Sequence, residues 1–106
     1  MADLQAIFDA MPERFQTGKA GDLDLGIQFD ITGDGGGKWY AHIKDGAIDV
    51  ERGIIDAPAA TLKMDADEFA KMSNGELNPM MAFMSGKIKV DGDLNSLMKF
   101  QTLVGL

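Results

Sequence analysis

Residues 78–93 read NPMMAFMSGKIKVDGD and contain the signals for a helix, a strand and the start of a second helix. Asn78 is a favoured N-cap residue, and Pro79 would occupy the first helical position, where a missing N–H costs nothing. The alternation of apolar and polar residues over 87–91 has the two-residue period of a strand, and Asp93 would cap the next helix. A helix, a strand and a helix in so short a span favour an α+β domain with helices packed on a sheet.

Four further strands are expected upstream, where apolar and polar side chains alternate. Their expected positions are residues 25–31, 38–44, 47–51 and 60–64. Asp45-Gly46 separates the second of these from the third and is a strong signal for a tight type I′ hairpin turn. The glycine loop at residues 33–37 connects two strands and lacks the Lys-Ser/Thr ending of a phosphate-binding loop, so we interpret it as a hairpin connection.

Helices are expected where apolar residues recur at three- and four-residue spacing. Besides the helix that begins at Pro79, these segments are residues 4–15, 66–73 and 94–104. Asp65 is a suitable N-cap for the second of them, and Asn74-Gly75 would end it. The element order predicts a single domain over residues 1–106, in which one sheet is covered by helices.

Composition narrows the possible partners and the compartment. The chain of 106 residues has 17 acidic and 10 basic residues and a net charge of -7, so phosphate backbones repel it and nucleic acid is not expected as a partner. It has no cysteine, which excludes disulfides, thiolate metal sites and cysteine nucleophiles. The first residues lack the basic start of a secretory signal, and the last three are not a peroxisomal tripeptide. We expect a cytoplasmic protein.

No group of residues points to catalysis, a metal or a cofactor. His42 is the single histidine, and no nearby serine or cysteine nucleophile accompanies it. Asp91-Gly92-Asp93 lacks the further oxygen ligands that a calcium loop requires. A small hydrolase or isomerase that uses His42 and a nearby acid remains a minor hypothesis, and replacing His42 by Ala would test it.

Methionine is concentrated in one part of the chain. Four of the eight methionines are Met72, Met80, Met81 and Met84. They are either ordinary core residues or the adaptable wall of an apolar pocket, because methionine fits varied apolar shapes. The PMMAFM helix is apolar all around and should need apolar contact on every side, and residues 100–106 contain no charged side chain. Both features favour a pocket or tunnel between sheet and helices, with Gln101 as an internal polar group.

Two longer stretches resemble the sterol carrier protein 2 (SCP2) family. They are FDITGDGGGKWYAHIKDGAIDVERG and PAATLKMDADEFAKMSNGELNPMMAFMSGKIKVDGDLNSLMKFQTL, and the likeness covers residues 5–104. The resemblance implies a two-layer fold in which helices cover one face of a five-stranded, mainly antiparallel sheet and enclose a hydrophobic tunnel. It also implies non-catalytic binding and transfer of a fatty acid, fatty acyl-CoA, sterol or phospholipid.

Carried over residue by residue, the resemblance implies which side chains line the tunnel. It does not decide between lipid transfer and an accessory role beside an enzyme. The implied ligand-binding residues are Phe69, Met72, Met80, Phe83, Met84, Leu97, Met98, Gln101, Leu103 and Val104. Cations that could meet a carboxylate or phosphate are sparse; the candidates are Arg14, Lys19 and Lys99. An alternative role is that of an accessory subunit presenting an isoprenoid or quinone-type substrate to a partner enzyme. We expect a monomer or weak homodimer with transient membrane or enzyme contacts.

Overall fold

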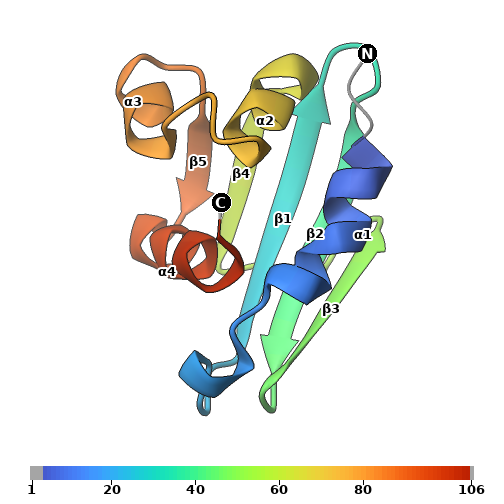
Figure 1. Ribbon diagram of the computed structural model, residues 1–106, viewed down its shortest axis with the longest axis vertical. Helices are drawn as coiled ribbons and strands as arrows, with labels where there is room; N and C mark the ends of the chain where they lie inside the picture. Colours follow the sequence, from blue (N-terminus) through green and yellow to red (C-terminus); the bar gives the residue numbers. More distant parts are fainter. Residues whose placement is uncertain (1–3, 106) are drawn as a thin grey trace.

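The computed structural model describes residues 4–105 and shows a twisted five-stranded sheet (Figure 1). The strands are β1 (Leu25–Thr32), β2 (Gly37–Lys44), β3 (Ala47–Arg52), β4 (Ala60–Asp65) and β5 (Lys89–Gly92), in the spatial order β3-β2-β1-β4-β5. β1 pairs with β4 in parallel, and the other three pairs are antiparallel. The mainly antiparallel five-stranded sheet is therefore confirmed, as is the Asp45-Gly46 turn, where both residues have a positive φ.

The helices lie on one face of this sheet (Figure 1). They are α1 (Leu4–Arg14), α2 (Ala66–Ser73), α3 (Pro79–Met84) and α4 (Leu94–Val104), with a short 3-10 turn, η1, over Thr17–Lys19. The predicted caps are present: Asp65 accepts a hydrogen bond from Asp67 N, and Asn78 accepts from Met80 N and Met81 N. These bonds satisfy amide groups that a helix N-terminus leaves without partners, which explains where α2 and α3 begin.

An aromatic cluster fills the space between the sheet and α1, α2 and α4. Phe8 of α1 stacks on Trp39 of β2 and on Phe69 of α2, with ring centroids 4.7 and 5.3 Å apart. Phe29 of β1 contacts Phe8, Phe69 and Phe100 of α4 at 5.1 to 6.0 Å. All five rings are buried, so this half of the interior is solid and holds the two layers together.

The opposite face of the sheet is polar and largely open. Gln28, which is buried, anchors the connection from β3 to β4 there: its Nε2 donates to Trp39 O and Gly53 O, and its Oε1 accepts from Ile55 N. His42 also lies on this face, where its Nε2 is 2.7 Å from Asp24 Oδ1. The histidine is thus on the side of the sheet away from the helices.

Candidate functional site

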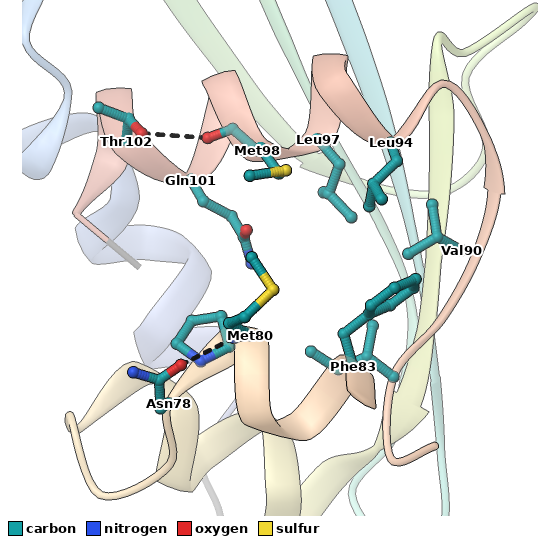
Figure 2. Close-up of a pocket in the computed structure, with 11 residues that line it drawn as sticks. Asn78, Met80, Phe83, Val90, Leu94, Leu97, Met98, Gln101 and Thr102 are labelled. Carbon is teal, nitrogen blue, oxygen red and sulfur yellow. Dashed lines mark hydrogen bonds between the residues drawn. The ribbon is translucent and has the colours of Figure 1, made fainter. Parts of the chain in front are cut away.

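An apolar hollow lies at the β5 end of the molecule, between α3 and α4 (Figure 2). Its volume is about 300 Å³, and its mouth is open to solvent. The wall is built by side chains of α3, β5, α4 and the residues that lead into them: Asn78, Pro79, Met80, Phe83, Ile88, Val90, Leu94, Leu97, Met98, Gln101 and Thr102. Most of these side chains are aliphatic, aromatic or thioether groups, so the hollow favours an apolar occupant.

The hollow exists because α3 approaches the rest of the protein through its smallest side chain. Among residues 79–84, Ala82 alone is buried, and its carbonyl accepts hydrogen bonds from Lys87 N and Ile88 N. The turn after α3 depends on Gly86, whose φ of 82° is a left-handed conformation that glycine adopts without strain. The bulky side chains of α3 therefore stand around this contact and leave space toward α4.

The two ends of the hollow differ in polarity. Phe83, Val90 and Leu94 gather at one end, whereas Asn78, Gln101 and Thr102 lie at the other (Figure 2). The Gln101 side chain reaches from α4 toward Met80 of α3, and the Thr102 hydroxyl donates to Met98 O within its own helix. A ligand with an apolar tail and a polar end would therefore have a preferred direction in this space.

A second, more polar hollow adjoins the first. Its volume is about 390 Å³, and its wall consists of Arg14, Met72, Ser73, Asn74, Gly75, Leu77, Asn78, Pro79 and Gly105. Asn78 and Pro79 belong to both walls, so the polar end of the first hollow faces the second. Arg14 Nη1 donates to Ser73 O at 3.5 Å, and within residues 4–105 no carboxylate forms an ion pair with this guanidinium.

The structure brings half of the sequence-predicted ligand residues to the first hollow. Met80, Phe83, Leu97, Met98 and Gln101 line it together. The other five do not: Phe69, Leu103 and Val104 are buried in the core, Met72 is buried and borders the second hollow, and Met84 is 79% exposed.

The expectation of apolar contact on every side of α3 is wrong. Met81 and Met84 are 66% and 79% exposed, because a six-residue helix attached through Ala82 can turn only one side to the protein. These two methionine side chains of α3 are therefore on the surface and not in the interior.

Sequence reasoning missed six residues of the wall. They are Asn78, Pro79, Ile88, Val90, Leu94 and Thr102. The sequence pattern assigns Asn78 and Pro79 to a helix start and Ile88 and Val90 to a strand. Asn78, Pro79 and Val90 have those roles, whereas Ile88 lies in the bend before β5. The apolar residues flanking the predicted turn at Gly86 were a usable signal, whereas nothing in the local pattern shows that α3 and α4 stand far enough apart to leave a hollow.

Other kinds of site receive no support from the described part of the chain. In residues 4–105, no three histidine, aspartate or glutamate side chains are grouped so that they could hold a metal ion. No helix in the same range has the length and apolar character needed to cross a membrane. The lining of the main hollow provides apolar contact along most of its length and hydrogen-bonding groups at one end.

The fold and the hollow define a class: small α+β domains with an apolar hollow between their helices and one end of a sheet. The model of the SCP-2 sterol transfer family matches residues 8–105. The chain belongs to this family.

Relatives with established names are longer proteins. Hydroxysteroid dehydrogenase-like protein 2 of Xenopus laevis is 36% identical over 104 residues, which cover 96% of this chain and 25% of that protein. The Xenopus tropicalis protein of the same name is 37% identical over 79 residues, which cover 74% of this chain and 19% of that protein. This chain thus spans about a fifth to a quarter of the length of these relatives.

Solved structures confirm the fold. A double mutant of the sec-alkyl sulfatase PisA1 superimposes with a TM-score of 0.84 at 22% identity, over 94% of this chain and 16% of that chain. Palmitated SCP2L2 of Aedes aegypti superimposes with a TM-score of 0.79 at 19% identity, over 100% of this chain and 96% of that chain. The ubiquinone synthesis protein UbiJ-SCP2 superimposes with a TM-score of 0.69 at 15% identity, over 96% of this chain and 90% of that chain.

Proposed function

We propose that this chain binds a lipid with a long apolar tail and carries it without changing it chemically. The observation that supports this most directly is the apolar hollow between α3 and α4. Each methylene moved from water to apolar surroundings contributes about 0.8 kcal/mol. About ten sheltered methylenes would contribute roughly 8 kcal/mol, which sets the upper limit of the affinity near micromolar before the costs of ordering are subtracted.

Within this function, we infer an amphipathic ligand with an anionic head group, such as a fatty acid, a fatty acyl-CoA or a phospholipid. The tail would occupy the end near Phe83 and Leu94, and the head group would pass Asn78 to reach Arg14. Support comes from the second hollow, where no carboxylate of residues 4–105 pairs with Arg14 although the chain has seven more acids than bases. A sterol fits this arrangement less well, because its ring system is rigid and it carries no charge.

Two measurements test the carrier function. Native mass spectrometry of freshly purified protein should show a bound apolar mass, and palmitate should displace a fluorescent fatty acid competitively. Val90→Trp would fill the hollow and abolish displacement, whereas Ile54→Trp, at an exposed position outside both hollows, would leave it unchanged. Absence of both the bound mass and the displacement in the unmodified chain would overturn the proposal.

The head-group assignment has its own test. Arg14→Gln should weaken palmitate binding about threefold to tenfold, a modest effect because the guanidinium is exposed to solvent. Binding of hexadecanol, which has the same tail and no charge, should not change. Equal losses for both ligands would show that Arg14 supports the fold of the site and does not bind the head group.

A second candidate function is presentation of an apolar, isoprenoid or quinone-type substrate to a partner enzyme. The observation that favours it is the exposed apolar surface of α3. The names of the longer relatives and of UbiJ-SCP2 are consistent with a role next to an enzyme. A tagged chain would then retain one specific enzyme at stoichiometric amounts. A lipid-loaded chain that purifies without such an enzyme would favour the first function.

A further inference from the structure

The methionines of residues 4–105 fall into two groups that differ in their access to solvent. Three of them are at most 4% exposed, and four are 41% to 79% exposed. The buried ones are Met11, Met64 and Met72, and the exposed ones are Met80, Met81, Met84 and Met98. Met80 of α3 and Met98 of α4 also line the hollow, on opposite sides of it (Figure 2). A small oxidant dissolved in water can therefore reach thioether side chains in the wall of the hollow.

Thioethers are the most readily oxidised groups that this chain offers. The sequence contains no cysteine, so no thiolate competes for a peroxide, and the single tryptophan, Trp39, is buried. Hydrogen peroxide converts methionine to methionine sulfoxide. The sulfur attacks one peroxide oxygen, an S–O bond forms as the O–O bond breaks, and the sulfur gives up two electrons. The departing hydroxide takes the proton of the transferred hydroxyl group and leaves as water.

We propose that Met80 and Met98 are sites of a reversible oxidative modification that lowers the affinity of the hollow for lipid. This inference rests on the proposed carrier function. A sulfoxide replaces a flexible apolar side chain with a polar one. A bound lipid tail would keep water away from the sulfoxide oxygen, and burying a polar group without a hydrogen bond is unfavourable. The oxidised wall therefore binds an apolar tail more weakly, and methionine sulfoxide reductases restore the thioether.

The other side chains of the wall do not remove this penalty. Next to Met98, Leu97 has no hydrogen-bond donor in its side chain, and the Thr102 hydroxyl is already bonded to Met98 O. On the other side, the Gln101 side chain reaches from α4 toward Met80 (Figure 2). A hydrogen bond from this amide to a Met80 sulfoxide would join α4 to α3 across the hollow and would obstruct the path of the tail. Oxidation at either position therefore opposes an apolar ligand.

The test compares two double variants before and after treatment with hydrogen peroxide. In the unmodified chain, peptide mass spectrometry should find an added oxygen on Met80 and Met98 and none on the three buried methionines. The dissociation constant of palmitate, measured by displacement of a fluorescent fatty acid, should then rise about tenfold. Met81→Leu with Met84→Leu should show the same rise, because neither residue lines a hollow. Met80→Leu with Met98→Leu should have one affinity before and after treatment, because it has no thioether in the wall of the main hollow.

Urea unfolding of the same samples separates a change in the wall from damage to the fold. The midpoint of the treated chain should stay close to that of the untreated chain, because both lining methionines are partly exposed and the buried ones are protected. Incubation of the treated chain with methionine sulfoxide reductases should restore the affinity for palmitate. A lowered midpoint that accounts for the lost binding, or a loss that the reductases do not reverse, would contradict a reversible modification of the wall.

The remaining outcomes distinguish this proposal from the one on which it rests. Unchanged palmitate affinity in a chain oxidised at Met80 and Met98, or no oxidation at these two residues, would overturn the modification site and leave lipid binding intact. Loss of affinity on treatment of Met80→Leu with Met98→Leu would also overturn it. An untreated, unmodified chain that does not bind palmitate would instead overturn the carrier function, and the effect of oxidation with it.

Discussion

Gln28 holds together two parts of the chain that sequence proximity does not connect. Its side chain is 5% exposed and forms hydrogen bonds with Trp39 O, Gly53 O and Ile55 N at 2.9 to 3.1 Å. Gln28→Ala should lower the free energy of unfolding by about 3 kcal/mol, because it leaves buried backbone groups without partners. Urea unfolding measures the change, and Gln16→Ala, at an exposed site, should alter it by less than about 0.5 kcal/mol. A loss below about 1 kcal/mol for Gln28→Ala would show that water replaces these bonds.

Tyr40 is the single tyrosine of the chain, so its titration can be followed directly by absorbance. Its hydroxyl donates to Glu51 Oε2 at 2.6 Å, and this bond, together with partial burial and the charges of Glu51 and Asp49, raises its pKa above the ordinary value. A raised pKa means that the bond stabilises the fold below the ordinary tyrosine pKa, near 10, and that this stabilisation is lost as the pH rises through the folded-state value. Glu51→Gln should lower the titration midpoint.

The matched control for this titration is Glu76→Gln, which removes the same charge at a site beyond the sheet, between α2 and α3. It should leave the midpoint of Tyr40 where it is. If both variants shifted the midpoint equally, the net charge of the molecule would be responsible and the hydrogen bond would not.

At the scale of elements, α4 has two faces with different tasks. Phe100 is fully buried in the aromatic cluster, whereas Met98 is 41% exposed and lines the hollow. Phe100→Ala should therefore cost about 3 to 5 kcal/mol of stability, and Met98→Ala less than about 1 kcal/mol. Met98→Ala should nevertheless weaken binding of a fluorescent fatty acid severalfold, which unfolding and displacement experiments on the same samples will separate. Similar stability losses for both would contradict the division into two faces.

The elements themselves were largely predictable from local signals. Local backbone and side-chain chemistry specifies the helix starts at Asp65 and at Asn78-Pro79 and the turn at Asp45-Gly46. The structure has a helix or a turn at each of these positions. The parallel pairing of β1 with β4 was not predicted, because it depends on a crossover between distant segments. Which of the ten implied ligand residues border the hollow also depends on contacts between distant segments. The family resemblance names Leu97 and Leu103 alike, and only the position of α3 decides that the first lines the hollow and the second is core.

At the scale of the whole molecule, the domain is divided into a solid half and a hollow half. The aromatic cluster on β1, β2 and their helices provides stability, and the β5 end, where α3 is attached through Ala82, provides space. This division is consistent with a general rule: binding elements belong to the less densely packed part of a fold. It also explains why a cavity-lining variant need not unfold the protein, which makes binding and folding separable in experiments.

A ligand that fills the hollow should therefore stabilise the whole chain by mass action. At a free palmitate concentration 100 times the dissociation constant, the free energy of unfolding should rise by about 2.7 kcal/mol, and for a domain of this size Tm should rise by roughly 10 °C or more. Differential scanning fluorimetry over a series of palmitate concentrations measures the shift. Val90→Trp should fold with little change in its own Tm and lose the palmitate-dependent shift, because the indole occupies the space of the tail. A shift of equal size in that variant would place the ligand elsewhere on the molecule and would remove the hollow between α3 and α4 from the binding mechanism.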